Sequence, residues 1–292
     1  MIKVCKFGGT SMADANAMCK VRDIIKADED RKYIVVSAPG KRFKDDIKIT
    51  DTLYKCYNDV IEKGNCKEKF KVIKDRFIEI VKDLKINLDI EKILDKTEKE
   101  INEKKSADFS ASRGEYLNAV LIAAFLGFDF VDTEKLIKFD KNGKLLLAET
   151  DEAIKAELDK HEKAVLPGFY GSMPDGSIKT FSRGGSDITG ALVARAVGAD
   201  VYENWTDVSG FLMADPRIVK KPKQIESISY KELRELSYMG ASVLHEDAIY
   251  PARSANIPIN IRNTNRPEDK GTMITAKEQA VGDQVIAGIA GS

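Results

Sequence analysis

The sequence predicts an α/β protein in which a mainly parallel central sheet lies between two layers of helices, a three-layer αβα sandwich. Short apolar runs typical of strands alternate along the chain with longer segments of helical periodicity. The run YIVVSA at 33–38 is almost continuously apolar, which is typical of a strand covered on both faces. Two Gly-Gly turns, at 8–9 and 184–185, stand where a strand pattern passes into a helical one. These observations favour βα units with parallel strands.

The first third of the chain begins with a strand, a glycine turn and a helix. IKVCKF at 2–7 is the predicted strand, and apolar residues recur at helical spacing from Ala17 to Ile25, with Asp14 as a suitable N-cap. From about 51 to 105 the pattern is helical and rich in charge. We interpret this stretch as an α-helical insertion with solvated faces.

The rest of the chain continues the alternation. A helix near 110–126 carries an apolar stripe that should pack in the core. A hairpin is predicted around Asn142 and Gly143, and a turn at 174–176. The remaining predicted elements are a strand at 128–132, a strand at 164–169, a helix that follows RGGSD at 183–187, and a strand at 199–207.

The length of 292 residues permits two compact bodies. We predict an N-terminal lobe at 1–200 and a C-terminal lobe at 201–280, joined by a tight connection near 198–202. Residues 281–292 are interpreted as the beginning of a further region.

Composition excludes several classes of protein. Lys and Arg together number 47, as do Asp and Glu, so no charge imbalance favours nucleic acid or an anionic membrane as a partner. A mean hydropathy of −0.30 and an N-terminus without a long apolar run disfavour a membrane protein and a secretory signal, so a cytoplasmic location is the default. The four cysteines and two histidines form no zinc-binding pattern, and we expect reduced thiols and no metal site built by the protein.

The two glycine turns, KFGGTS at 6–11 and SRGGSD at 182–187, are candidate anion sites. Glycines let the backbone approach a ligand closely, and the N-terminus of the following helix favours negative charge. Lys6 precedes one turn and Arg183 the other. A lysine ammonium group suits a phosphate as a point charge, and an arginine guanidinium group can form two parallel hydrogen bonds with a carboxylate. Neither turn matches a P-loop or a dinucleotide-binding fingerprint. A Gly-Gly pair alone is also compatible with plain turn chemistry.

Four separated segments together resemble the catalytic domain of aspartate kinases, which are amino acid kinases. They are KFGGTSMAD at 6–14, FSASRGE at 109–115, FSRGGSDITGALVA at 181–194 and ENWTDVSGFLMADPR at 203–217. MGASVLHEDA at 239–248 is similar to a further segment of that family. The resemblance covers about residues 3–275 in the family's order, and it implies a sandwich of the amino acid kinase type.

The resemblance implies MgATP-dependent phosphorylation of the side-chain carboxylate of L-aspartate to 4-phospho-L-aspartate, the first step toward lysine, threonine and methionine. A carboxylate with a pKa of about 3.9 is ionised at neutral pH, so it needs positioning and positive charge rather than a histidine base. The implied cofactors are ATP and Mg²⁺, with the metal held mainly by phosphate oxygens and water. The expected partners are L-aspartate and ATP, with no nucleic acid and no membrane. A homo-oligomer is compatible with the apolar end of the sequence.

The resemblance also implies roles for individual residues. Lys6 and Asp187 are the implied catalytic residues. Arg183 matches an arginine that holds the substrate α-carboxylate, and Glu115 and Asp187 match acids that bind its ammonium group. In the N-terminal lobe, the implied aspartate-binding residues are Thr50, Glu115, Arg183, Ser186 and Asp187. The implied ATP-binding residues, which extend into the C-terminal lobe, are Lys6, Gly8, Gly9, Thr10, Ser37, Thr206, Asp207, Phe211, Leu212, Asp215 and Arg217.

Several of these positions have a structural alternative. Glu115 and Asp187 are also compatible with ordinary acids in the first turn of a helix. Trp205 in the WTD stretch is equally compatible with core packing, and His245 with a structural hydrogen bond. The segment at 42–49 looks longer than the usual loop of the family, which leaves the register at Thr50 open.

Two departures from the family pattern bear on function. Many members have a lysine at the position of Ser242, so either Lys41, Arg217 or Lys220 supplies the missing charge or the phosphate site is less positive. Aspartate kinases typically continue into ACT regulatory domains, and residues 281–292 resemble the first strand of such a domain. We therefore favour a truncated chain over a catalytic-only form, and expect it to be insensitive to lysine and threonine.

Two other functions stay open. A sister amino acid kinase would act on glutamate, acetylglutamate, carbamate or UMP, although acetylated and nucleotide substrates lack the ammonium group that the two acids would pair. A non-catalytic amino-acid-binding subunit would retain the fold without turnover, and the serine at position 242 favours that alternative.

Overall fold

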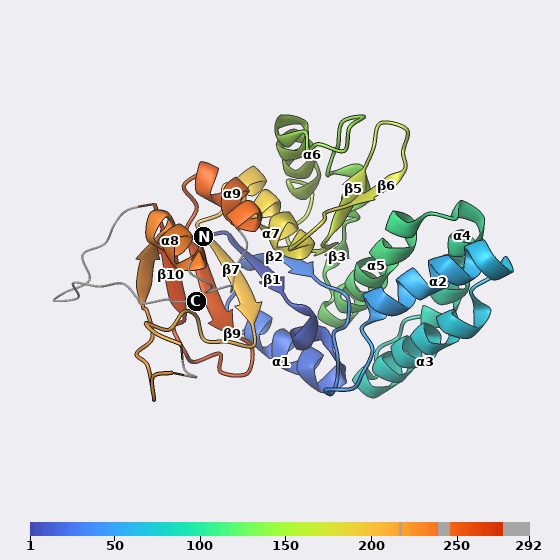
Figure 1. Cartoon of the computed structure of the whole chain (residues 1–292), viewed down its shortest axis with the longest axis horizontal. Helices are drawn as coiled ribbons and strands as arrows, with labels where there is room; N and C mark the ends of the chain where they lie inside the picture. Colours follow the sequence, from blue (N-terminus) through green and yellow to red (C-terminus); the bar gives the residue numbers. More distant parts are fainter. Residues whose placement is uncertain (216–217, 239–245, 277–292) are drawn as a thin grey trace.

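The computed structural model describes residues 1–215, 218–238 and 246–276 (Figure 1). Its centre is an eight-stranded sheet in which neighbouring strands are parallel, apart from one antiparallel pair between β9 and β10. The mainly parallel sheet expected from the sequence is confirmed. In spatial order the strands are β3 (Asp129–Phe130), β4 (Ala164–Pro167), β2 (Arg31–Val36), β1 (Lys3–Phe7), β7 (Val201–Thr206), β9 (Ile259–Asn263), β10 (Thr272–Thr275) and β8 (Ser227–Ser229).

Helices cover both faces of the sheet, so the three-layer sandwich is confirmed (Figure 1). Successive strand residues point to opposite faces: Cys5 and Ile34 belong to one buried cluster, and Val4 and Val35 to the other. The first face packs against α1 (Ala15–Lys26) and α5 (Ala107–Leu126). The second packs against α6 (Leu147–Leu158), α7 (Gly185–Val197), α8 (Tyr230–Tyr238) and α9 (Glu246–Ser254).

The expected helical insertion consists of α2 (Ile49–Lys63), α3 (Lys67–Leu84) and α4 (Ile90–Lys104), at one end of the molecule beside α5 (Figure 1). Each of the three helices buries one stripe of residues. In α4 the buried residues are Ile90, Leu94, Thr97 and Ile101, a helical spacing that leaves the lysines and glutamates of the other face in solvent. The cluster that covers the first face of the sheet continues into this insertion.

Local signals in the sequence explain most element boundaries. Asp14 caps α1 as expected, because its Oδ1 accepts a hydrogen bond from the Ala17 amide at 2.8 Å. The turn at 174–176 closes a small hairpin of β5 (Tyr170–Ser172) and β6 (Ile178–Thr180). The strand expected at 128–132 is reduced to β3, because Asp132 instead caps the 3-10 helix η2 (Thr133–Lys135) through the Glu134 amide.

One sheet runs through both expected lobes, since β7 pairs with β1 on one side and β9 on the other. A buried ion-pair network joins β2, β7 and β9: Glu203 accepts a hydrogen bond from Arg31 Nε at 2.7 Å and lies 3.7 Å from Arg262 Nη1. The division at residue 200 stays a prediction. The proposed start of a further region at 281–292 lies outside the described residues.

Among the described helices, none combines the length and the apolar character that crossing a bilayer requires.

Candidate active site

The carboxyl ends of β1, β2 and β7 meet at one edge of the sheet, and the turns that follow them lie side by side. The Ser37 amide donates to Phe7 O at 3.2 Å, and the Gly8 amide donates to Trp205 O at 3.1 Å. After β1 the chain forms the 3-10 helix η1 (Gly9–Met12). In parallel α/β sheets this edge is the usual place for a ligand.

A cavity of about 290 Å³ opens at this edge. Six of the predicted residues line it, and they come from both glycine turns, the end of β2, α2 and α5: Lys6, Ser37, Thr50, Glu115, Ser186 and Asp187. Gly184 and Gly185 of the second glycine turn also line it, as do three residues that sequence reasoning missed, Lys48, Asp51 and Phe169. The sequence left open whether Thr50 belongs to the site, and the structure places Thr50 in the cavity wall.

Lys6 and Asp187 join the two glycine turns directly. Lys6 Nζ lies 2.6 Å from Asp187 Oδ1, and the lysine side chain is only 10% exposed. Asn204 donates to the same carboxylate oxygen at 2.8 Å. Asn204 is the ladder partner of Lys6, so the two side chains leave the sheet on the same face. Asp187 therefore holds the ammonium group of Lys6 at the cavity.

Glu115 is the most unusual acid of the cavity. It is 6% exposed, and burial raises its pKa to about 8, although hydrogen bonds from backbone groups and the charge of Arg113 act in the opposite direction. Its Oε2 atom has no hydrogen-bond partner among the described residues. A buried carboxyl oxygen without a partner, on the wall of a cavity, is suited to a cationic group of a ligand.

Glycines allow the backbone segments around the cavity to approach one another. A Cβ atom on Gly40 would lie 2.5 Å from the carbonyl carbon of Gly9, and one on Gly114 would lie 2.8 Å from Ala38 Cβ. Gly184, which precedes α7, has a φ of +57°. Phe169 adopts a φ of +84°, an uncommon conformation for a residue with a bulky side chain. Such backbone strain at a cavity wall is typical of functional sites.

Some of the predicted residues lie beside the cavity rather than in its wall. Arg183 is exposed and precedes the lining residue Gly184, and Thr10 is also exposed. Gly8 and Gly9 are half-buried in the turn that follows Lys6. The roles implied for them stay predictions.

The implied nucleotide segment runs along the same edge toward β10. Thr206 donates to Asp207 Oδ1 at 3.2 Å. The amide of Phe211, a buried residue, donates to Thr272 Oγ1 at 2.8 Å and so fastens the segment to the sheet. Leu212 is 43% exposed and Asp215 is half-buried.

Trp205 is a core residue, as its structural alternative proposed. The side chain is fully buried and stacks on Phe7 with ring centroids 5.9 Å apart, and the guanidinium carbon of Arg262 lies over the indole ring, 4.6 Å from its centroid. The indole ring cannot touch a nucleotide in this arrangement. The backbone of Trp205 contacts the Gly8 turn, because its carbonyl oxygen accepts the hydrogen bond from the Gly8 amide.

Three residues singled out from the sequence, Arg217, Ser242 and His245, lie outside the described residues. Of the cations considered as substitutes for the missing lysine, Lys41 and Lys220 are exposed and line no part of the cavity. Lys48, which immediately precedes α2, does line it.

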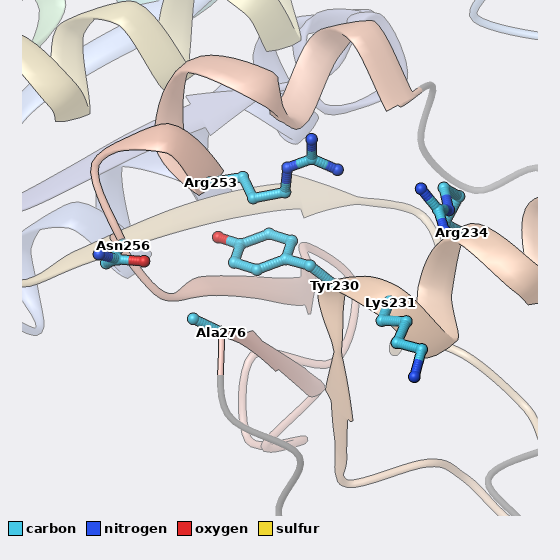
Figure 2. Close-up of a pocket in the computed structure, with 6 residues that line it drawn as sticks. All are labelled: Tyr230, Lys231, Arg234, Arg253, Asn256 and Ala276. Atoms are coloured by element: carbon cyan, nitrogen blue, oxygen red, sulfur yellow. The ribbon is translucent and has the colours of Figure 1, made fainter.

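A second cavity, also of about 290 Å³, lies between α8, α9 and the end of β10 (Figure 2). Its lining residues are Tyr230, Lys231, Arg234, Arg253, Asn256 and Ala276. The Tyr230 hydroxyl donates to Ile257 O at 2.5 Å, just before β9 begins. This places the second cavity at the opposite edge of the sheet from Lys6, and none of the predicted site residues belongs to it.

Over the ranges that the structure describes, no three His, Cys, Asp or Glu side chains are grouped so that they could hold a metal ion. Any divalent cation at the cavity would therefore take most of its ligands from a bound substrate and water.

The fold and the Lys6 cavity define a class of protein, and comparison with known proteins agrees with it. The sequence model of the amino acid kinase family matches residues 1–263. The chain belongs to the amino acid kinase family.

Its similar relatives include aspartokinases. Aspartokinase 3 of Bacillus subtilis is 37% identical over 299 residues, which cover 98% of this chain and 66% of the relative. The crystal structure of Clostridium acetobutylicum aspartate kinase has 53% identity and a TM-score of 0.94, over 99% of this chain and 66% of that protein. The chain thus spans about two thirds of the length of these proteins.

Two further structures bear on ligands and on fold. Escherichia coli aspartokinase III in complex with aspartate and ADP has 28% identity and a TM-score of 0.81, over 96% of this chain and 66% of that protein. Uridylate kinase of Archaeoglobus fulgidus has 15% identity and a TM-score of 0.51, over 94% of this chain and all of that protein, a likeness that shows the fold alone.

Proposed function

We propose that the protein is an aspartate kinase, which transfers the γ-phosphoryl group of ATP to the side-chain carboxylate of L-aspartate and forms 4-phospho-L-aspartate. The observation that carries the proposal is the single cavity in which Lys6, held by Asp187, lies together with the unpartnered carboxyl oxygen of Glu115. The similarity to aspartokinases and to a structure with bound aspartate and ADP supports the choice of substrates.

The cavity suits a small zwitterion with two carboxylates. Its volume of about 290 Å³ lies at the small end of ligand sites, which span roughly 300–1,000 Å³. In the proposal Glu115 accepts the α-ammonium group, while Ser37 and Thr50 offer hydroxyl groups near the reacting end. Arg183 at the rim is the residue that the family resemblance assigns to the α-carboxylate, and Lys48 is a second cation within reach of the cavity.

The reaction requires positive charge between two anions. The aspartate carboxylate attacks phosphorus while the bond from phosphorus to the β,γ-bridging oxygen breaks, and ADP leaves with that oxygen. Lys6 reduces the repulsion between carboxylate and triphosphate and stabilises charge on the transferring phosphoryl group. Asp187 and Asn204 keep the Lys6 ammonium in place, and this positioning is the role we assign to Asp187 beside its implied contact with substrate.

The nucleotide would lie along the turn at Gly8 and Gly9 and the segment from Thr206 to Asp215. Here the backbone is close-packed, because a Cβ atom on Gly9 would lie 3.1 Å from Ala38 O. Mg²⁺ fits this proposal as an ion held chiefly by phosphate oxygens, since the described residues supply no ready set of metal ligands. The proposed reaction stands at the start of lysine, threonine and methionine synthesis, and we propose a cytoplasmic location for it.

A coupled assay of ADP release tests the proposal. With Mg²⁺ and ATP, aspartate should support turnover, while glutamate, acetylglutamate, carbamate and UMP should not. Hydroxylamine should trap the acyl phosphate product as the β-hydroxamate of aspartate. A preference for another acceptor would select a sister amino acid kinase, and ATP binding without turnover on any acceptor would select a non-catalytic subunit.

Lys48→Ala should raise the KM for aspartate about fivefold with little change in kcat, because it removes a solvent-exposed charge worth about 1 kcal/mol to a bound carboxylate. Lys44→Ala is the matched control, since Lys44 is an exposed lysine of the same loop that does not line the cavity. Steady-state kinetics at low and moderate salt measure the effect. Equal KM values for the two variants would exclude Lys48 from the aspartate site.

A further inference from the structure

The helical insertion carries a buried arginine that reaches the loops of the cavity. Arg76 lies on α3 and is 5% exposed. Its Nη2 atom donates to Ala13 O at 2.8 Å and to Gly40 O. Its Nη1 atom donates to Ile47 O at 3.5 Å and lies 3.6 Å from Asp46 Oδ2. One guanidinium group thus contacts three separate stretches of backbone.

These three stretches belong to two loops that adjoin residues of the cavity wall. Ala13 ends the turn that begins at Gly8, the implied phosphate site. Gly40 and Ile47 belong to the loop between β2 and α2, which leads directly into Lys48 and Thr50. The two loops also touch each other, because the Gly40 amide donates to Gly9 O at 2.8 Å.

A guanidinium group is suited to this position and an ammonium group is not. Arginine presents five N–H donors in a fixed planar fork, whereas lysine offers three donors around one point. Asp46, the acid closest to Arg76, is already engaged by Arg42 Nε at 2.9 Å. Arg76 Nε has no hydrogen-bond partner among the described residues, so part of a buried charge is left unsatisfied. Burying a charge costs free energy, and in some proteins such a group is retained because it fixes one particular arrangement.

We propose that Arg76 is a positioning residue for phosphoryl transfer: it fixes the spacing between the phosphate turn at 8–13 and the segment at 47–50 that meets the aspartate side chain. The proposal rests on the proposed function. Transfer between two bound groups depends on their alignment, and a displacement of about 1 Å can cost roughly 100-fold in rate. The helical insertion would then support catalysis from outside the cavity.

The test compares Arg76→Lys and Arg76→Ala with Lys74→Ala. Lys74 is on the same helix, but its ammonium group pairs with Asp95 and Glu98 on α4, away from both loops. Both Arg76 variants should lose about 10- to 100-fold in kcat, with KM values for ATP and aspartate changed by less than about threefold. Added guanidinium ion should restore part of the kcat of Arg76→Ala. Lys74→Ala should retain kcat within about twofold.

Hydrogen exchange supplies a readout that does not depend on activity. In Arg76→Lys the amides of Ser11 and Gly40, which bond within and between the two loops, should exchange faster, while those of β1 and β2 should not. Exchange and kcat indistinguishable from those of Lys74→Ala would overturn the proposal. If the wild-type chain does not phosphorylate aspartate, the proposed function fails, and the exchange data alone then decide whether Arg76 joins the loops.

Discussion

Lys6→Met should lower kcat for aspartate phosphorylation by about 100- to 1,000-fold, the usual cost of removing a group that stabilises charge in a transition state. Among the described residues that line the cavity, Lys6 is the cation paired with an acid, since its ammonium group lies 2.6 Å from Asp187 Oδ1. Methionine occupies a similar length without charge, so the variant tests charge rather than packing. Steady-state kinetics with saturating ATP and aspartate measure the loss.

Lys3→Met is the matched control for this prediction. Lys3 lies on the same strand, but its ammonium pairs with Asp28 at 2.6 Å and it lines no part of the cavity. We expect its kcat to stay within about twofold of the wild type. A Lys6→Met enzyme that retains more than a tenth of the wild-type kcat would remove Lys6 from the chemistry.

Glu115→Gln should raise the KM for aspartate by about 10- to 100-fold at pH 9, because a hydrogen bond between two charged groups is worth roughly 1.5–3 kcal/mol. The effect should shrink at pH 6. Burial raises the pKa of Glu115 to about 8, so in the empty cavity the wild-type side chain is largely protonated at pH 6 and cannot pair with an ammonium group. Michaelis constants measured from pH 6 to 9 test this.

The wild-type KM for aspartate should therefore fall as the pH rises through about 8, while that of Glu115→Gln stays flat. Glu149→Gln, the same change at an exposed position on α6, should follow the wild type. A pH profile that survives in Glu115→Gln would show that another group governs aspartate binding.

The raised pKa of Glu115 also predicts how the stability of the fold depends on pH. The folded-state pKa of Glu115 is raised from an ordinary value of 4.5 to about 8, so the stability linked to its protonation is complete below pH 4.5 and is lost as the pH rises through 8. Glutamine does not ionise. Thermal unfolding should therefore show that the Tm of Glu115→Gln increases relative to that of the wild type between pH 5 and pH 9. A difference in Tm between the two proteins that does not change with pH would argue against a raised pKa for Glu115.

The sequence predicts the sandwich well because its signals are local. Apolar strands, the Asp14 cap and the Gly-Gly turns each act within a few residues, and each is present where it was expected. The site is predicted in part for the same reason. Lys6 follows from the turn at the end of β1, at the edge of a parallel sheet where ligands usually bind. Asp187 follows from the second glycine turn, although the strand before that turn, β6, belongs to the antiparallel hairpin and not to the main sheet.

Other parts of the site depend on contacts that no local pattern encodes. Arg76 reads as one charge on an amphipathic helix, yet it contacts Ala13 across 63 positions of sequence. Phe169 adopts a positive φ, and an aromatic residue in the sequence gives no signal for that conformation. The role of Asn204 could have been predicted, because the alternation of side chains along β7 places Asn204 on the same face of the sheet as Lys6. Trp205 was ambiguous because a tryptophan at a strand end suits both a core and a ligand.

A crystal structure of the protein with L-aspartate and a non-hydrolysable ATP analogue tests the central claim most directly. We expect the α-ammonium group within hydrogen-bond distance of Glu115, the side-chain carboxylate between Thr50 and Lys6, and the γ-phosphate against the turn at Gly8 and Gly9. Aspartate bound outside this cavity, or a γ-phosphate without contact to Lys6, would contradict the account.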